Sequence, residues 1–488
     1  MAHRAAGRRQ RRDRRRPAPA DQPCPSAPRP PRSHRGRAGA PRGADDDQLG
    51  LARVRRRPEP PLPVVGRRRR RHPRPGRRRR DVRPCSREPC RPLVRHTPGG
   101  PVTTALKAPT PESFTSRLHS PAVAARVGVW LGVCFGVAFL TGLISHYAQN
   151  VSQPIPFPTS PSWGYRVTQG LHVITGTAAI PLLLVKLWTV YPKFFERPPR
   201  NVRRVVVEVL ERINTGLLVS AGIFLLVSGT LNVAQWYPWE FSYRRTHYAV
   251  AWVAIGALVV HIAVKLPIIR DALRGHVDDT THDNPSATRD SGVSRRGLLT
   301  TTWVAGGMAV LTTAGSTVPA LRDLSIFGVR SGDGPGGIPI NKSAAAADVT
   351  ATATSSSYSL SVVHGDNAVT LTRDDLMAMT QRTETLPIAC VEGWSANGTW
   401  TGVRLRDLLD LVDAPRDSDV GIGSLQREGA FRDSLLQGNF ADDDRTLLAL
   451  QLDGEPLSID HGYPCRLIAP NRPGVLQTKW VSTIEVPA

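Results

Sequence analysis

The sequence has 488 residues, enough for two or three domains, and 64 Lys and Arg against 40 Asp and Glu give it a formal net charge of +24. The charge is unevenly distributed, because residues 1–100 contain 31 Arg, no Lys and 8 acidic residues and so carry 23 of the 24 net charges. The rest of the chain is nearly neutral. This distribution excludes a protein whose folded domains are uniformly basic.

The N-terminal tract, residues 1–105, combines Arg, Pro and Gly with almost no apolar periodicity, so we expect it to be disordered. A basic run of this kind can bind nucleic acid through phosphate contacts, but no nucleic-acid-binding fold accompanies it and we expect no nucleic-acid partner. An alternative is that the tract is not translated natively. No Met lies between Met1 and Met308, whereas Val102 begins VTTALKAPTPESF, which a GTG codon could start.

Five apolar stretches have the length of about 20 residues that a membrane-spanning helix requires. They are Val127 to Ile144, Val167 to Val190, Gly216 to Ala234, Tyr248 to Leu266 and Leu298 to Ala320. The fifth is the least apolar because it is rich in Thr and Gly. The sequence therefore predicts a bundle of four spans, followed by a fifth span that serves as an anchor.

The distribution of Lys and Arg predicts how these spans are oriented in a cell membrane. Six basic residues between Lys193 and Arg212 place the loop between the second and third spans in the cytoplasm. The loops at 154–163 and 235–241 then lie outside, where Trp236, Tyr237 and Trp239 would contact membrane lipid. The fifth span would carry the C-terminal third across the membrane.

A pair of arginines precedes the fifth span in SRRGLL, Ser294 to Leu299. Twin arginines before an apolar segment are typical of signals for the export of a domain that is already folded. Two arginines at the cytoplasmic end of any span also satisfy the ordinary charge bias. The pair therefore gains weight if the domain that follows contains a cofactor inserted in the cytoplasm.

Four histidines, His146, His172, His247 and His261, lie within or at the ends of the predicted spans. Ionisable side chains at such depth are a functional hypothesis by default. The fourteen residues between His247 and His261 correspond to about 21 Å of helix and bring both side chains to nearly the same face. This spacing suits a helix that ligates one haem near each membrane surface.

The preferred axial pair of the outer haem is His172 with His247, with His146 as the substitute. His261 lies deeper, and its expected partner is Lys186, which departs from a symmetric pattern for two haems. The segments GLHVITGTAAIPLLLVKLW and RTHYAVAWVAIGALVVHI resemble the four-helix cytochrome b membrane domains that feed periplasmic oxidoreductases. This resemblance implies one or two haem b groups. Alternatively, the histidines only form hydrogen bonds across the bundle.

The last third of the chain changes character twice. Residues 321–357 are rich in Gly, Ala, Ser and Thr and predict a flexible linker. From Tyr358 short alternating runs such as YSLSVV, LPIACV and WVSTIEV are separated by turn residues, with helical patterns at RDDLMAMT and VRLRDLLDLV. These patterns predict a β-rich α+β domain over residues 358–488.

Several motifs of this domain, CVEGWS, WTGVRLRDLL and LLALQLDGEPLSIDHGYPCRLIAPNRPGVLQTKWVSTIEV, occur in the order found in the sulfite oxidase family. The domain thus resembles the molybdopterin-binding domain of that family. The resemblance implies that Cys390 binds molybdenum and that Glu392 points into the same cavity, as in its methionine sulfoxide reductase branch. Trp394 would form a wall of this cavity.

The resemblance further implies that basic residues bind the phosphate of the pterin. The matching positions are His461, Arg466, Arg472 and Lys479. Arg side chains and nearby backbone N–H groups suit a phosphate. EGWS stands where sulfite oxidases have a Gly-Asn-Arg turn. The arginines that bind the anionic substrate of those enzymes are therefore assigned no counterpart in this sequence, and the resemblance does not identify the small-molecule substrate.

Cys465 is the other cysteine of this domain, in the apolar run CRLIA, and we expect a buried core thiol. A disulfide between Cys390 and Cys465 is the alternative, since the domain would lie outside the cytoplasm.

Together these features predict a chain of several domains. They are the tract 1–105, an all-α cytochrome b-like membrane domain at 106–275, the segment 276–320 with the paired arginines and fifth span, the linker 321–357, and the molybdopterin-binding domain 358–488. We expect a multi-pass oxidoreductase of the cell membrane with its catalytic domain outside, exchanging electrons through haem with a quinone or another redox partner. The alternative is a haem b electron-transfer protein whose C-terminal domain is a non-catalytic docking module.

Overall fold

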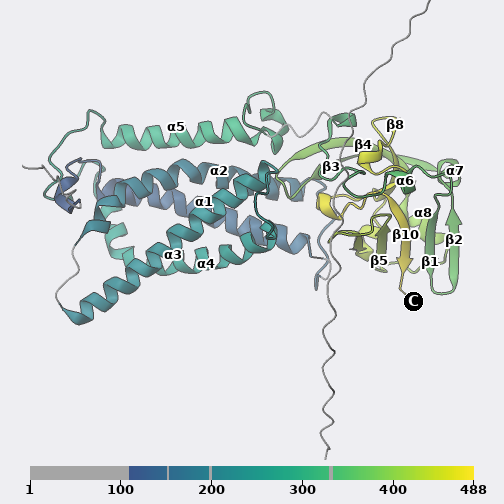
Figure 1. Cartoon of the computed structure of the whole chain (residues 1–488), viewed down its shortest axis with the longest axis horizontal. Coiled ribbons are helices and arrows are strands. Elements are labelled where there is room, and N and C mark those ends of the chain that lie inside the picture. Colours follow the sequence, from purple (N-terminus) through teal and green to yellow (C-terminus); the bar gives the residue numbers. More distant parts are fainter. Residues whose placement is uncertain (1–108, 151–152, 197–200, 329–333, 488) are drawn as a thin grey trace, which may run out of the picture. The chain divides into compact units, whose positions relative to one another are not determined.

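The computed structural model describes residues 109–150, 153–196, 201–328 and 334–487. The tract predicted to be disordered, residues 1–105, lies outside these ranges. The described chain consists of long helices followed by a β-rich domain (Figure 1). This arrangement confirms the predicted fold class.

Four helices form the bundle. They are α1 (Pro121–Ala148), α2 (Gly164–Val190), α3 (Val202–Val233) and α4 (Tyr243–Arg274). Each contains the apolar stretch predicted from the sequence, except that α3 ends one residue earlier, and each is long and apolar enough to cross a membrane. Large apolar side chains such as Leu140, Leu184 and Val259 are more than half exposed. A helix that is apolar around its whole circumference fits a lipid environment.

The fifth predicted span is only partly reproduced. The helix α5 (Arg295–Thr313) ends seven residues before Ala320, and short 3-10 turns at Ala314–Ser316 and Pro319–Leu321 follow it. It lies alongside α2 (Figure 1), and Trp303 packs edge-to-face against Trp130 of α1 with ring centroids 4.5 Å apart. Its Thr and Gly content keeps it out of the group of helices in the described residues that are apolar enough to span a membrane. The fifth span stays a prediction.

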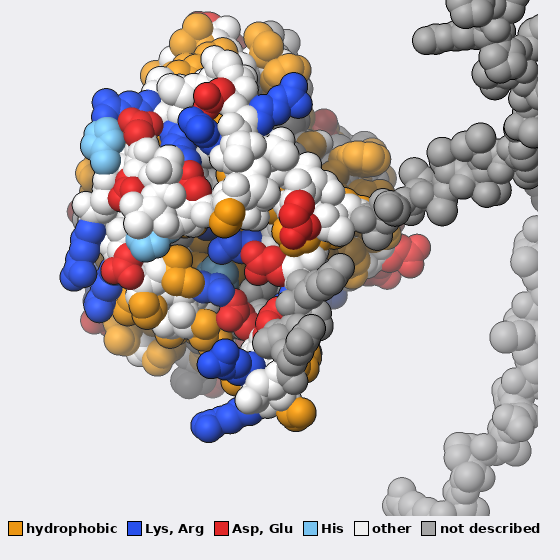
Figure 2. All heavy atoms as spheres, turned by 90° about the vertical axis from the view of Figure 1, so that its left-hand side faces the viewer, with side chains coloured by type: hydrophobic (Ala, Val, Ile, Leu, Met, Phe, Trp, Pro, Cys, Tyr) orange, Lys and Arg blue, Asp and Glu red, His pale blue; other side chains and the backbone are white. Residues whose placement is uncertain are grey.

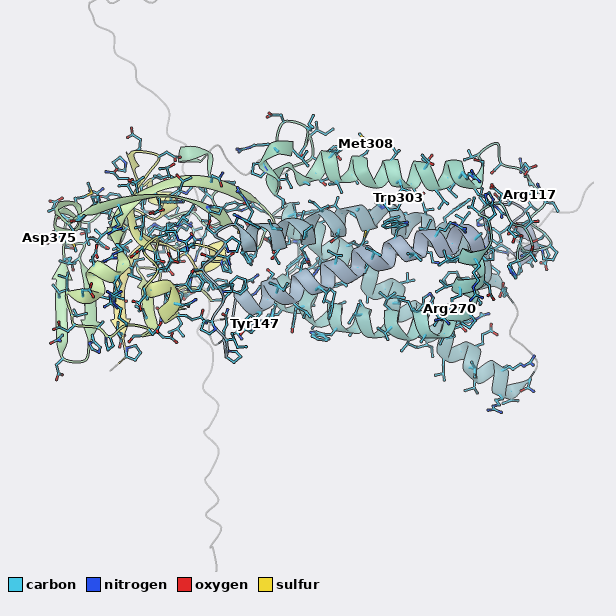
Figure 3. All side chains as sticks on the ribbon, turned by 180° about the vertical axis from the view of Figure 1, so that it is seen from behind. Arg117, Tyr147, Arg270, Trp303, Met308 and Asp375 are labelled. Atoms are coloured by element: carbon cyan, nitrogen blue, oxygen red, sulfur yellow. The ribbon has the colours of Figure 1, made fainter. Side chains whose placement is uncertain are left out.

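Charged side chains gather at one end of the bundle, as Figure 2 shows. Arg117 and Arg270 lie at this end, whereas Tyr147 lies at the opposite end (Figure 3). Arg295, the first of the paired arginines, is buried here, where it forms an ion pair with Asp283. The second, Arg296, is exposed and lies 3.3 Å from Asp278. The charged end is the one that the sequence places in the cytoplasm.

Two sheets, one mixed and one antiparallel, build the C-terminal domain. The first has the order β2 (Asn367–Leu371), β1 (Leu360–His364), β10 (Val481–Val486), β5 (Val420–Ser424) and β6 (Asp433–Leu436). The second has the order β3 (Gln381–Ala389), β4 (Ser395–Arg404), β7 (Leu447–Leu452) and β8 (Glu455–Pro456), with β9 (Arg466–Ile468) also paired to β7. Only β1 and β10 pair in parallel among these strands.

Short helices complete the domain. They are α6 (Thr350–Ala353), α7 (Arg373–Ala378), α8 (Leu405–Asp410) and α9 (Gly438–Ala441), with 3-10 turns at Pro335–Gly337, Ile459–His461 and Gly474–Leu476. Helix α8 follows β4 directly and buries Leu405, Leu408 and Leu409 in the main apolar core. The helices predicted at RDDLMAMT and VRLRDLLDLV correspond to α7 and α8.

Part of the predicted flexible linker, residues 321–357, is packed against the domain. Ala344, Val349 and Ala353 are buried in one cluster with Trp480, the residue before β10. Ile338 is fully buried in another cluster. Small Ala side chains let the backbone approach the Trp480 ring closely, and composition alone does not distinguish such a segment from a linker. The limits of the domains stay a prediction.

Candidate active site

The hairpin formed by β3 and β4 carries Cys390 at its turn. The two strands pair in antiparallel register up to Ala389 opposite Ser395, so residues 390–394 form the connection. The Cys390 N–H donates to the Trp394 carbonyl at 2.9 Å, and the Gly393 N–H donates to the Cys390 carbonyl at 3.1 Å. Gly393 has φ +86, a conformation that favours glycine. Backbone hydrogen bonds and the conformation of Gly393 therefore fix the shape of this turn.

The Cys390 side chain faces a small cavity of the C-terminal domain. The residues that line it are Pro339, Asn341, Ile388, Cys390, Trp394, His461, Arg466, Gly474 and Lys479. This set, called the Cys390 cavity below, unites four of the predicted site residues with Cys390. Burial, and then the negative charge of Glu392, raises the pKa of the Cys390 thiol.

Two buried cations, Arg466 and Lys479, face this cavity. Arg466 donates to the His461 carbonyl at 3.2 Å, while its Nε has no partner within the described residues. Burial lowers the pKa of Arg466 to about 10. Lys479 Nζ donates to Asn341 Oδ1 at 3.1 Å and to the Lys342 carbonyl, and burial, followed by the charge of Arg466, lowers its pKa to about 7.

These features fit an anionic group such as the phosphate of a pterin cofactor. No Asp or Glu lines the Cys390 cavity as the described residues define it, so its two buried cations lack a counter-charge there. Gly462, with φ +114, brings backbone close to both cations, since a Cβ at this position would lie 3.1 Å from the Cβ of Arg466. A buried Arg with an unpaired N–H is a suitable phosphate ligand.

Arg472 lies away from the Cys390 cavity. Its guanidinium donates to the backbone carbonyls of Leu476 at 3.1 Å and Leu435 at 2.7 Å. It lines a different cavity, which also contains Gln153 and Phe440. The structure thus assigns its hydrogen bonds to the protein backbone and does not group it with His461, Arg466 and Lys479.

Glu392 lies beside the Cys390 thiol but is not among the residues lining the cavity. Its Oε2 accepts hydrogen bonds from Trp394 Nε1 at 3.1 Å and Gln235 Nε2 at 2.6 Å, and Cys390 Sγ lies 3.7 Å away. The sequence predicted that Glu392 points into the same cavity as Cys390. In the structure its carboxylate lies beside the Cys390 thiol and contacts Gln235 in the loop between α3 and α4, and its place in the cavity stays a prediction.

Cys465 is buried in the main core, where its thiol lies 3.0 Å from the Tyr358 hydroxyl. Both Cys390 and Cys465 are free thiols in the structure, so the alternative disulfide is not formed. The surroundings of Cys465 are those of the predicted core thiol.

A second cavity, of about 310 Å3, lies within the helix bundle. It is called the bundle cavity below, and His146, His172 and His247 line it together with apolar residues from α1 to α4. Val391 and Gly393 of the Cys390 turn line it as well.

The imidazoles of His172 and His247 are brought together across the bundle cavity, with ring centroids 6.1 Å apart. His172 Nδ1 lies 2.8 Å from the Ala138 carbonyl, and His247 Nδ1 lies 2.9 Å from Ser228 Oγ. Each Nδ1 thus has a hydrogen-bond partner, which leaves the Nε2 atoms as candidate ligands. A metal between two imidazoles lies about 2 Å from each nitrogen, which is compatible with this separation.

The other two candidate histidines are placed differently. His146 stacks on Tyr248 with ring centroids 3.7 Å apart. His261 Nδ1 is buried without a hydrogen-bond partner in the described part of the chain. Lys186, its expected partner, donates from Nζ to the Ala124 carbonyl at 2.7 Å. The structure therefore shows no equivalent of the His172–His247 pair at His261.

Three residues near Cys390 were missed by the sequence analysis. Asn341 comes from the segment interpreted as a linker, and Asn232 and Gln235 come from the end of α3. No motif marks them, because they meet Cys390 only through tertiary packing.

Comparison with known proteins identifies the C-terminal domain. Residues 346–488 match the family model of the oxidoreductase molybdopterin binding domain. The chain is 27% identical to the uncharacterized oxidoreductase YuiH of Bacillus subtilis, covering 32% of this chain and 82% of that protein. It is 32% identical to the putative protein-methionine-sulfoxide reductase subunit YedZ1 of Azospira oryzae, covering 24% and 43%.

The sulfite oxidase of Arabidopsis thaliana is 29% identical over 19% of this chain. The chain spans only 28% of the length of that enzyme, so the similarity concerns part of it. Residues 346–488 therefore form a molybdopterin-binding oxidoreductase domain of the sulfite oxidase type, which follows a bundle of four apolar helices.

Proposed function

We propose that this chain is a membrane-anchored, molybdopterin-dependent oxidoreductase that acts on a small-molecule substrate outside the cell membrane and exchanges electrons with a quinone or another redox partner. The observation that carries the proposal is the buried cluster of Cys390, His461, Arg466 and Lys479 in a domain that matches the molybdopterin-binding family. A buried cysteine and buried cations without a counter-charge in the cavity are the two features that suit a metal-bearing, phosphate-bearing cofactor.

In this proposal, different residues of the Cys390 cavity bind different parts of the cofactor. Cys390 would ligate molybdenum, because a soft thiolate suits a metal already held by sulfur ligands. Arg466, Lys479 and His461 would bind the phosphate, and Trp394 would exclude water from one side. The molybdenum cofactor would supply two-electron or oxygen-atom-transfer chemistry.

Glu392 would act beside the metal ligand, held by Gln235 and Trp394. Its carboxylate would accept or hold a proton at Oε2 while the substrate reacts. A negative charge at this position disfavours an anionic substrate, which agrees with the absence of the Gly-Asn-Arg turn. The names of the relatives include sulfite oxidase and methionine-sulfoxide reductase, and the substrate class of this chain is a question for direct assay.

The helix bundle would carry electrons between the molybdenum site and the quinone or other redox partner. His172 and His247 would ligate one haem b near the outer membrane surface, oriented by the Ala138 carbonyl and Ser228. His146 would not be needed as a ligand, since it stacks on Tyr248. A second haem at His261 has less support, because Lys186 is engaged with the Ala124 carbonyl.

Membrane orientation completes the proposal. The charged end of the bundle would face the cytoplasm, with α5 as a fifth span and the domain from residue 346 outside. The paired arginines before α5 would direct export of this domain after cofactor insertion.

The test is elemental analysis for Mo and Fe on the purified chain, with reduced-minus-oxidised spectra, for the wild type and two cysteine variants. Cys390→Ser should remove most of the Mo while leaving Fe unchanged. Cys465→Ser, the matched control, should retain both. A wild-type protein without Mo after growth on ample molybdate would contradict the proposal and favour the haem protein with a docking module. Mo lost only from Cys465→Ser would overturn the assignment of the ligand.

A further inference from the structure

The three residues in the middle of the Cys390 turn are each hydrogen-bonded by a residue from outside the C-terminal domain. Asn232 Nδ2, at the end of α3, donates to the Val391 carbonyl at 2.9 Å. Gln235 Nε2 donates to the Glu392 carboxylate at 2.6 Å. The hydroxyl of Thr317, which follows α5, donates to the Gly393 carbonyl. The middle of the turn is thus held by the helical part of the chain.

The backbone at Gln235 shows that this position is unusual. The Gln235 N–H donates to the Asn232 carbonyl and the Trp236 N–H donates to the Leu231 carbonyl, the pattern of a Schellman helix end. In this motif the left-handed residue is most often glycine, yet Gln235 occupies it with φ 52. A side chain in this conformation costs free energy that glycine would avoid. The strain is retained where the amide reaches Glu392.

The contact of Gln235 is directly connected to the proposed metal ligand. Glu392 Oε2 accepts from Gln235 and from Trp394 Nε1, and Cys390 Sγ lies 3.7 Å from the same oxygen. Asn232 is itself oriented, because its Oδ1 accepts from the Tyr237 hydroxyl at 3.2 Å. Movement of either amide would therefore change the position of the Cys390 turn.

We propose that Asn232 and Gln235 are positioning residues of the oxidoreductase site, so that this site is completed by the end of α3 and not by the C-terminal domain alone. The inference rests on the proposed function and deepens it. Val391 and Gly393 also line the bundle cavity. The same two amides therefore fix how the Cys390 turn is placed against the His172–His247 pair.

The experiment uses the full-length chain in detergent with three variants. Gln235→Met keeps the length of the side chain and removes the donor. Gln235→Gly removes the donor but relieves the left-handed conformation, so a role limited to ending α3 predicts equal or higher stability and an unchanged turn. Gln153→Met is the matched control, since Gln153 accepts a hydrogen bond from Gln437 of the C-terminal domain and forms none with residues 390–394 in the described chain.

Two readouts do not depend on turnover. Amide hydrogen exchange of the peptide containing residues 387–396 should become about tenfold faster in Gln235→Met and Gln235→Gly, the effect of losing one strong hydrogen bond. It should not change in Gln153→Met. In protein that contains Mo, the electron paramagnetic resonance spectrum of the reduced metal centre should also shift in both Gln235 variants at unchanged Mo content.

The possible outcomes separate this inference from the proposed function. If amide hydrogen exchange in both Gln235 variants is as slow as in the wild type, the inference is overturned, whether or not the protein contains Mo. Faster exchange in a chain without Mo supports the contact and contradicts the proposed function. Faster exchange only in Gln235→Met, with Gln235→Gly like the wild type, assigns Gln235 to the helix end alone and also overturns the inference.

Discussion

Arg466 and Arg472 are both buried arginines of the C-terminal domain, yet their guanidinium groups have different partners. Arg472 donates to two backbone carbonyls, whereas Arg466 leaves its Nε without a partner in the described residues and faces the Cys390 cavity. The sequence motif treats the two alike, because both match basic positions of the family. Only the folded chain distinguishes an arginine that donates to backbone carbonyls from one with a donor available to a ligand.

This difference predicts opposite effects of removing each charge. Arg472→Met leaves two carbonyls without their donor and should lower the free energy of unfolding by about 2–4 kcal/mol while Mo per folded chain stays near the wild-type value. Arg466→Met should lose most of the Mo and destabilise the cofactor-free chain less than Arg472→Met does, since it removes a hydrogen bond to one carbonyl, that of His461, instead of two. Denaturation curves and elemental analysis check both. Loss of Mo from Arg472→Met alone would reverse the two assignments.

Lys479 makes the stability of the cofactor-free chain depend on pH. Burial lowers its pKa to about 7, whereas an unfolded chain would bind this proton up to a pH of about 10.5. Between these values the unfolded state binds more protons, so stability should rise with pH, by on the order of 5 kcal/mol across the whole window. Unfolding curves at pH 7, 8 and 9 measure the slope.

Lys479→Met should flatten this slope, and Lys342→Met should reduce it only slightly, because the charge of Lys342 is a minor cause of the lowered pKa of Lys479. An equal slope in Lys479→Met and the wild type would show that other groups cause the dependence. Bound cofactor phosphate should also reduce the slope, because an anion keeps Lys479 protonated in the folded chain.

At the scale of elements, the long helices were predictable because each depends on its own composition. An apolar stretch of about 20 residues identifies a span without knowledge of its neighbours, and all four stretches lie in α1 to α4 apart from the last residue at α3. The short strands β5 and β6 were missed, since Val420–Ser424 and Asp433–Leu436 have weak alternation. Strand β5 is fixed by pairing with β10, and β6 by pairing with β5. The contact between the end of α3 and the Cys390 turn has no local signal at all.

The contacts between α2, α3 and α4 predict how substitutions of the histidines change haem binding. His247→Ala should abolish the b-type absorbance of the proposed outer haem, and Ser228→Ala should weaken its binding about 10-fold to 100-fold, because Ser228 bonds His247 at Nδ1. His146→Ala, the matched control from the same cavity, should retain the absorbance. Redox difference spectra of membranes measure this, and loss of absorbance in His146→Ala but not His247→Ala would make His146 the ligand.

At the scale of the whole molecule, the paired arginines have a structural role beside their proposed role in export. Arg295 is buried, paired with Asp283 and bonded to the carbonyls of Val277 and Asp279. Its role in folding the charged end of the bundle is therefore sufficient to explain its presence. Arg296 is exposed and lies beside Asp278, so it is the better residue with which to examine an export signal.

Arg296→Lys keeps the positive charge at the charged end of the bundle and leaves the buried Arg295 in place. Charge bias alone then predicts normal orientation, whereas a receptor that recognises two guanidinium groups predicts retention of residues 346–488 in the cytoplasm. We expect retention, measured as protection of the C-terminal domain from protease added to spheroplasts. Asp278→Asn, which removes the carboxylate beside Arg296 and His276 and keeps both arginines, should be exported and cleaved. A cleaved domain in Arg296→Lys would show that the charge bias before α5 is enough to carry it across the membrane.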